Sequence, residues 1–156
     1  MSPLVYVETS VISYLVARPS RDIVTAAHQQ VTREWWEQRS RFDLFASQAV
    51  LTEAARGDAI VAALRLQALA SVMMLPVTAE AGGLAEHLIQ ANAMPAEAAI
   101  DALHVAVAVA NGMDYLVTWN CTHIANATLR TKIERACREA GFQAVVICTP
   151  EELLQE

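Results

Sequence analysis

The chain has 156 residues, 54% of which are apolar, and a formal net charge of −6. This composition excludes an intrinsically disordered protein, and the length is typical of one domain, which we expect to span residues 1–156. The negative charge argues against nucleic-acid binding through bulk positive charge. It is compatible with an enzyme that holds cations between acidic side chains and a polyanion, because bound cations invert the local charge.

Short apolar runs alternate with segments of helical periodicity along the chain. Residues 4–7 form an apolar run with β-branched and aromatic side chains, which predicts a buried strand. Glu8 stands where this strand ends, and Thr9 or Ser10 is the expected N-cap of the next helix. The later strands are expected at residues 42–46, 72–77, 115–118 and 144–148, and the later helices at 23–39, 48–56 (capped by Ser47), 59–69, 79–92, 96–110 and 127–140, with a short one after Pro150.

Strands that alternate with helices in this way predict a fold class. Parallel strands need crossover connections, which helices supply, and the helices then cover both faces of the sheet. We therefore expect an α/β fold, a three-layer α/β/α sandwich with a mainly parallel sheet of about five strands.

The cysteines and the apolar stretches indicate a cytoplasmic protein. Cys121, Cys137 and Cys148 are widely spaced and form no CxxC motif, which is typical of free thiols in a reducing compartment. The start of the chain lacks the basic region of a signal peptide. The longest apolar stretch, near residues 102–110, is too short to cross a bilayer, so we expect no membrane association.

The segment 96–110 is apolar nearly all round, which predicts a helix buried on most sides. Its polar side chains, Glu97, Asp101 and His104, are spaced by four and then three residues. This spacing places them in one stripe, which we expect to face a cleft.

Four oxygen-bearing side chains are expected at one edge of the sheet. Glu8 follows the first strand, Glu53 and Asp101 lie in the second turns of their helices, and Asn120 follows the fourth strand. Strand carboxyl ends and helix amino ends share an edge in a right-handed α/β fold. Carboxylates gathered there repel one another unless they bind a cation, and oxygen ligands suit Mg²⁺ or Mn²⁺. His123, in the loop beside Asn120, is a candidate contact for substrate phosphate.

Other chemistries lack their motifs. The sequence contains no GxGxxG, no GxxxxGK[ST] and no GxSxG, and its histidines form no zinc-binding pattern. A phosphoacceptor receiver domain would need a pair of acids at the first strand and a lysine near the last strand. Glu8 stands alone at the first strand, and the only lysine, Lys132, lies on a predicted helix, so this reading is disfavoured.

The ordered set of motifs resembles the PIN domain, and within it the toxins of VapBC-type toxin–antitoxin pairs. The matching segments are residues 5–12, 51–53, 101–106 and 112–120. The resemblance covers essentially the whole chain. It implies a metal-dependent endoribonuclease that forms homodimers and whose site is occluded by an antitoxin.

The resemblance also assigns site residues. Glu8, Glu53 and Asp101 match the acidic metal ligands, and Asn120 matches the fourth polar position. Small hydroxyl positions beside the metal are matched by Thr9 and Thr118, which we expect to contact the substrate. From their place in the stripe on the segment 96–110, rather than from the resemblance, Glu97 and His104 are expected to stand beside the ligands without binding the metal.

Two of these positions depart from the family pattern. The first acid is usually Asp, whereas Glu8 is one methylene longer, and the fourth position is often Asp, whereas Asn120 removes one negative charge. Fewer charges predict weaker metal binding. The leading hypothesis is a ribonuclease in which Glu8 and Asp101 hold the principal metal and Glu53 orients it or activates water. The alternative is a binding module of the same fold that has weak catalysis or none.

Overall fold

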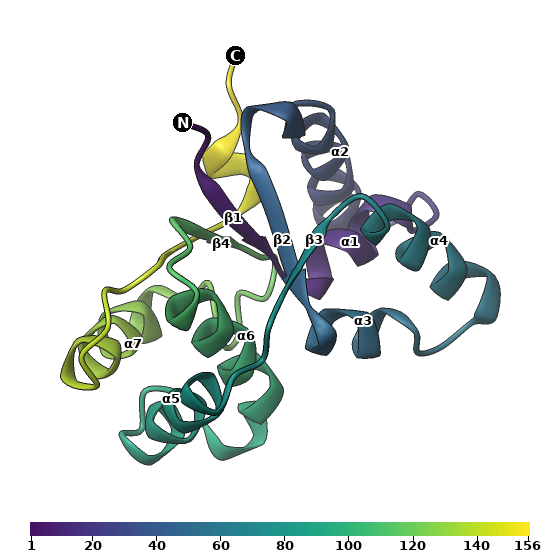
Figure 1. Ribbon diagram of the computed structural model, residues 1–156. Coiled ribbons are helices and arrows are strands. Elements are labelled where there is room, and N and C mark those ends of the chain that lie inside the picture. The colour runs from purple at the N-terminus through teal and green to yellow at the C-terminus, as the bar shows by residue number, and fades with distance from the viewer.

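The structure is a computed structural model that describes residues 1–156, and five parallel strands form its central sheet (Figure 1). The strand order is β3-β2-β1-β4-β5. The strands are β1 (Leu4–Val7), β2 (Asp43–Ser47), β3 (Met73–Leu75), β4 (Tyr115–Val117) and β5 (Val146–Cys148). The register pairs Tyr6 with Phe45 on one side and with Leu116 on the other. The predicted five-stranded α/β fold is confirmed.

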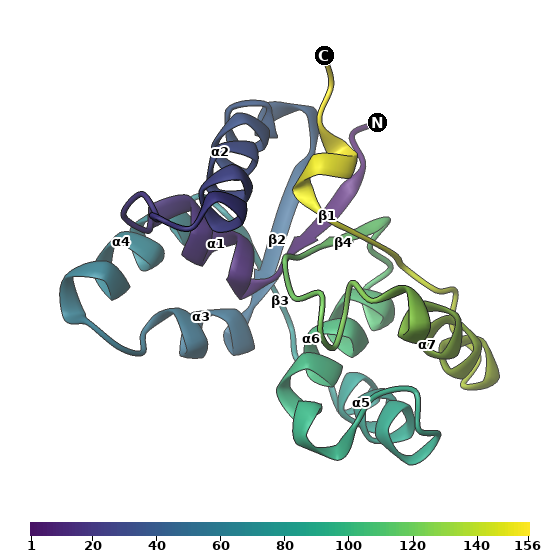
Figure 2. The ribbon, with the colours of Figure 1, turned by 180° about the vertical axis from the view of Figure 1, so that it is seen from behind.

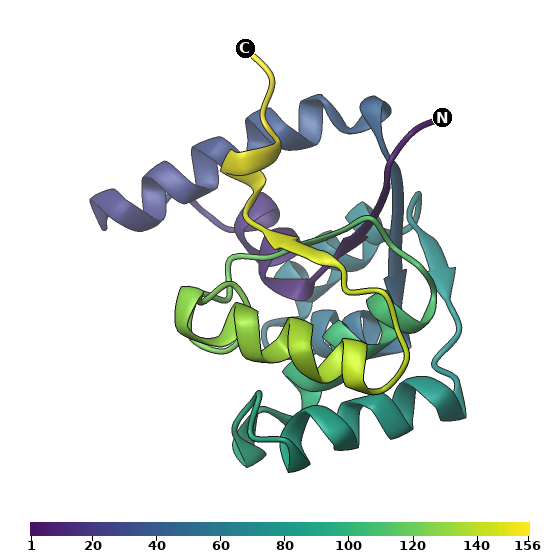
Figure 3. The same ribbon diagram turned by 90° about the vertical axis from the view of Figure 1, so that its left-hand side faces the viewer.

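Helices cover both faces of the sheet. The helices are α1 (Thr9–Val16), α2 (Ile23–Glu37), α3 (Gln48–Ala54), α4 (Ala59–Leu69), α5 (Ala79–Gln90), α6 (Ala99–Ala110) and α7 (Ala127–Glu139), with short 3₁₀ helices at Arg39–Arg41, Ala96–Ala98 and Pro150–Leu153. Figures 1 and 2 show α1, α2, α3 and α4 on one side of the sheet and α5, α6 and α7 on the other. Figure 3 shows that the start of α2 extends beyond the sheet.

The core lies around the central strand β1. Val5, Tyr6 and Val7 are completely buried because helices pack on both faces of this strand and β2 and β4 flank it. Helix α6 is buried along most of its length, as its apolar composition predicted. Its neighbour α5 packs along it, and α3 meets it at the edge where the strands end. This edge is where β1, α3, α6 and the loop after β4 meet.

The starts of α6 and α3 differ from what the sequence predicted. The segment predicted as one helix from residue 96 begins as a 3₁₀ turn, and α6 starts only at Ala99. Ser47 occupies the N-cap position of α3, but its side chain makes no capping hydrogen bond. Its hydroxyl instead contacts the Tyr6 hydroxyl, because both side chains are buried in the same layer.

Candidate functional site

Glu8 is the buried acid of the candidate site. It is the N-cap of α1, where we expected Thr9 or Ser10, and its Oε2 accepts a hydrogen bond of 2.6 Å from the Ser10 N–H. Its Oε1 accepts none, and only 4% of the residue is exposed. Burial raises the pKa of this carboxyl, because the charged form loses hydration. The side chain is therefore not turned to solvent, and no Lys or Arg forms an ion pair with it.

Glu53 reaches the same region from α3. Its Oε1 accepts hydrogen bonds from the Thr9 hydroxyl at 2.7 Å and from His104 Nε2 at 2.5 Å. Burial alone raises the pKa of this carboxyl, but the two hydrogen bonds and the positive potential of His104 and Arg56 bring it below its ordinary value. The Glu53 side chain is 29% exposed, so it reaches the surface while Oε1 accepts hydrogen bonds from Thr9 and His104 inside the protein.

His104 is completely buried, and sequence reasoning missed Tyr6, which contacts it from behind, and the role of Ser47 behind Tyr6. Its Nδ1 lies 2.7 Å from the Tyr6 hydroxyl, which in turn lies 2.8 Å from Ser47 Oγ. The sequence does contain a sign that Tyr6 makes a buried hydrogen bond. Tyr6 is the one aromatic residue on an otherwise aliphatic buried strand, and a buried tyrosine hydroxyl needs a hydrogen-bond partner.

Asp101 pairs with the loop after β4. Its Oδ2 lies 3.0 Å from His123 Nδ1, and its side chain is 20% exposed. The backbone N–H of His123 also donates to the Asn120 side-chain oxygen at 3.0 Å. Asp101, His123 and Asn120 therefore form one connected group, while Glu53 and His104 form another. This pairing of each outer acid with a histidine was not predicted.

The hydroxyls beside this loop fix its position. Thr118 is buried, and its Oγ1 accepts a hydrogen bond from the Asn120 N–H at 2.9 Å. The Ser10 hydroxyl accepts one from the Trp119 N–H at 2.8 Å and lies 3.4 Å from the Thr118 hydroxyl. The start of α1 is thus tied to the loop that carries Asn120 and His123.

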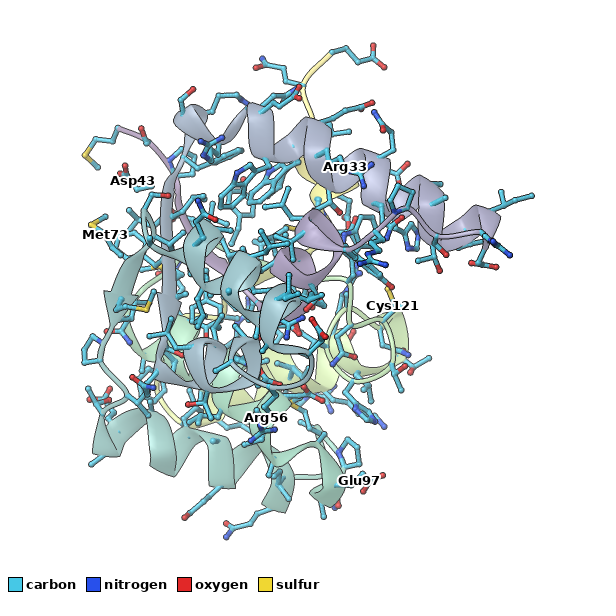
Figure 4. The ribbon with its side chains drawn as sticks, turned by 90° about the vertical axis from the view of Figure 1, so that its right-hand side faces the viewer. Arg33, Asp43, Arg56, Met73, Glu97 and Cys121 are labelled. Atoms are coloured by element: carbon cyan, nitrogen blue, oxygen red, sulfur yellow. The ribbon has the colours of Figure 1, made fainter.

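Glu97 is not brought to the other candidates. It lies in the 3₁₀ turn before α6, is exposed and makes no side-chain hydrogen bond or ion pair. Figure 4 shows its label at the outer margin of the molecule, below that of Arg56. The tighter 3₁₀ winding of residues 96–98 breaks the helical stripe that the spacing of four predicted.

The three acids of the candidate site have the oxygen donors that a hard divalent cation prefers, but their side chains are not grouped tightly enough to surround one. No three side chains of His, Cys, Asp or Glu are grouped so that they could hold a metal ion together. The three acids nevertheless offer oxygen donors, none is paired with Lys or Arg, and both Glu8 Oε1 and Glu53 Oε2 accept no hydrogen bond. Such donors suit Mg²⁺ or Mn²⁺.

A hollow of about 300 Å³ adjoins Glu53 on its outer side. Apolar and polar side chains share its wall, which is lined by Gln48, Ala49, Thr52, Glu53, Arg56, Val77, Ile100 and Leu103. It is open to solvent and provides space beside the carboxylate for part of a larger ligand.

No protein-family model and no curated protein sequence matches the chain. Among solved structures, a chain of VapBC2 from Rickettsia felis, in a crystal structure with a DNA fragment from their promoter, is similar, with a TM-score of 0.59. The two chains are 16% identical, and the match covers 94% of this chain and 98% of that chain. Similarity at this level of identity establishes a shared fold, and the chain therefore has the PIN-like α/β/α fold that its motifs predicted.

Proposed function

We propose that the protein is a metal-dependent endoribonuclease that hydrolyses RNA phosphodiester bonds and acts as the toxin of a toxin–antitoxin pair. One observation carries the proposal: Glu8 buries a carboxylate at the end of the central strand, and no Lys or Arg neutralises it. A buried acid without a cationic partner lowers stability. The presence of this buried carboxylate at the ligand-binding edge of an α/β sheet is accounted for if the working protein binds a cation there.

The acids would have different tasks in this proposal. Glu8 and Asp101 would hold the principal metal, each through the carboxylate oxygen that its hydrogen bond leaves free. Glu53 would orient the metal or a water molecule through Oε2, since Oε1 is occupied by two donors. The Asn120 side-chain oxygen already accepts the His123 N–H, so we assign Asn120 to the support of the loop and to a weaker metal contact.

A bound Mg²⁺ or Mn²⁺ would stabilise negative charge at the phosphate and activate water. Substrate binding and the support of the site depend on the protein's own side chains. His123 is 29% exposed and lies beside Asp101 with Nδ1–H directed at that carboxylate, so its Nε2 can donate to a substrate phosphate only in the imidazolium form, which carries a hydrogen on both ring nitrogens. The hollow beside Glu53 leaves room for the neighbouring nucleotide. Thr9 and Thr118 act inside the protein by fixing Glu53 and Asn120.

The decisive experiment uses protein freed of any bound partner and a structured RNA. Wild type should cleave the RNA with Mn²⁺ or Mg²⁺ and stop when EDTA is added. Asp101→Asn should be inactive, whereas the control Asp43→Asn should keep wild-type activity, because Asp43 is exposed at the opposite end of its strand (Figure 4). Equal activity of the wild type and Asp101→Asn would contradict the proposal.

A binding module without catalysis is the second candidate. It is favoured by the absence of a three-residue metal cluster and by Asn120, which carries no charge where the family pattern often has an acid. Calorimetric titration with Mn²⁺ separates the two candidates. Uptake of Mn²⁺ that is lost in Asp101→Asn supports the nuclease, while the absence of uptake together with inert wild-type protein supports the binding module.

The proposed partners are an antitoxin and a second copy of the chain. Apolar side chains are exposed on two helices, Ile23 and Val24 at the start of α2 and Ile60 and Leu64 on α4. Such side chains are compatible with protein–protein contacts. Light scattering on the purified chain at increasing concentration tests the homodimer. No helix has both the length and the apolar character needed to cross a membrane.

A further inference from the structure

A continuous line of hydrogen bonds runs from the interior to Glu53. It starts at Ser47 Oγ on β2, passes the Tyr6 hydroxyl on β1 at 2.8 Å, reaches His104 Nδ1 on α6 at 2.7 Å and ends at Glu53 Oε1 on α3, 2.5 Å from His104 Nε2. Ser47, Tyr6 and His104 are completely buried. The line therefore joins four elements of the fold inside the protein, where water does not compete for these contacts.

The chemistry of the two ends fixes which ring nitrogen of His104 carries a proton. A carboxylate only accepts hydrogen bonds, so the nitrogen facing Glu53 must be an N–H. The Tyr6 hydroxyl both donates and accepts. It can donate to a bare Nδ1 or accept from a protonated one, with Ser47 completing the pattern in either case. The arrangement that the line excludes is the one in which Nδ1 alone carries the proton.

The same line leaves Glu53 with one free oxygen. His104 and Thr9 both donate to Oε1, and Oε2 accepts no hydrogen bond. Two donors on one oxygen fix the plane of the carboxylate, and the 29% exposure of the side chain leaves the second oxygen accessible. The orientation of Glu53 thus depends on the ring of His104, and that ring is held from behind only by Tyr6.

We propose that Tyr6, with Ser47 behind it, is a positioning residue that holds His104 Nε2–H against one oxygen of Glu53 and so presents the other oxygen to the metal ion or water. This role rests on the proposed nuclease function. Tyr6 lies behind His104 and does not touch the substrate. Partners of this kind in metal sites typically change affinity or activity by about 10–100-fold when they are removed.

Tyr6→Phe tests the proposal, because it keeps the ring and removes the hydroxyl. We expect Mn²⁺ affinity and kcat to fall by about 10–100-fold, with little change in KM for RNA, and Ser47→Ala to show a smaller loss. The matched control is Tyr115→Phe. Tyr115 lies on β4, the strand next to β1, and its hydroxyl makes no hydrogen bond. Its Mn²⁺ affinity and kcat should equal those of the wild type.

Two further measurements separate positioning from general loss of stability. Tyr6→Phe added to His104→Gln should cause no further loss of Mn²⁺ affinity, since Tyr6 acts through His104. The ring ¹⁵N spectrum of the metal-free wild type should show a protonated Nε2 on His104. An Nδ1–H tautomer, or an additive double variant, overturns the proposal. If the wild type neither binds Mn²⁺ nor cleaves RNA, the nuclease function fails, and the ¹⁵N spectrum still decides whether His104 holds Glu53 through Nε2–H.

Discussion

His123 Nδ1 and Asp101 Oδ2 lie 3.0 Å apart, so the acid on α6 is held by the loop after β4 rather than by another acid. This bond occupies one oxygen of Asp101 and leaves the other free. It also ties the proposed ligand to the loop that contains Asn120. A hydrogen bond of this kind orients a carboxylate for metal binding.

His123→Ala should therefore weaken Mn²⁺ binding by about 10-fold or more, because Asp101 loses its orienting donor. The measurement is calorimetric titration of the metal-free protein. The control is His87→Ala, since His87 lies on α5 near Glu139, away from the candidate site. Unchanged Mn²⁺ affinity in His123→Ala would show that the loop does not support the site.

Glu8→Gln should raise the free energy of unfolding of the metal-free protein by roughly 1–3 kcal/mol at neutral pH, because a buried carboxylate without a Lys or Arg partner is removed. The folded-state pKa of Glu8 lies above its ordinary value of 4.5, so the folded protein binds this proton more tightly than the unfolded chain. The wild type then loses stability as the pH rises from 4.5 towards the folded pKa.

The stability difference between Glu8→Gln and the wild type should accordingly be small below pH 4.5 and should grow above it. Urea unfolding across this pH range measures it. The same variant should lose Mn²⁺ binding, so stability and function should change in opposite directions. Glu97→Gln, which alters an exposed carboxylate, serves as the control and should change neither quantity. A destabilised Glu8→Gln protein at neutral pH would show that the charge is compensated.

Metal addition should stabilise the wild type. At a free Mn²⁺ concentration of 100 times Kd, binding to the folded state alone adds about 2.7 kcal/mol. For a chain of this length we expect Tm to rise by about 5 °C or more, and EDTA should reverse the rise. Asp101→Asn should show no rise, whereas Asp43→Asn should behave as the wild type. A rise of equal size in all three proteins would indicate binding elsewhere.

Thr32→Val should destabilise the protein by about 1–3 kcal/mol, because it leaves a buried indole N–H without an acceptor. Thr32 Oγ1 accepts a hydrogen bond of 2.7 Å from Trp119 Nε1 and donates to the His28 carbonyl at 2.6 Å. Urea unfolding followed by tryptophan fluorescence measures the change. Thr131→Val, on an exposed position of α7, is the matched control and should change stability by less than about 0.5 kcal/mol.

Cys121 should be the only thiol of the native protein that reacts readily with iodoacetamide at pH 8. Burial raises the pKa of Cys137 to about 11 and that of Cys148 to about 12, whereas Cys121 is exposed. A higher pKa means less thiolate at a given pH, here on the order of one part in a thousand or less. Mass spectrometry should find one label in the native protein and three in urea, and rapid labelling of Cys137 would contradict the burial.

The sequence indicates that the Tyr6 hydroxyl needs a partner, but it does not reveal that the partner is His104 or that His104 in turn holds Glu53. Tyr6 and His104 are separated by 98 positions, and His104 and Glu53 by 51. Periodicity showed that His104 shares a helix with Asp101, but it does not give the rotation of that helix against its neighbours. His104 consequently points into the core, while Asp101, three residues before it, points to the loop at His123.

The sequence by itself determined the alternation of strands and helices, and with it the parallel sheet and the edge at which Glu8, Glu53, Asp101 and Asn120 lie. These features follow from local periodicity and from the fixed direction of parallel strands. Only the tertiary structure decided which side chain each acid contacts. Those contacts depend on side-chain rotamers and on helix packing, and together they paired two of the acids with histidines and left Glu8 buried without a Lys or Arg partner.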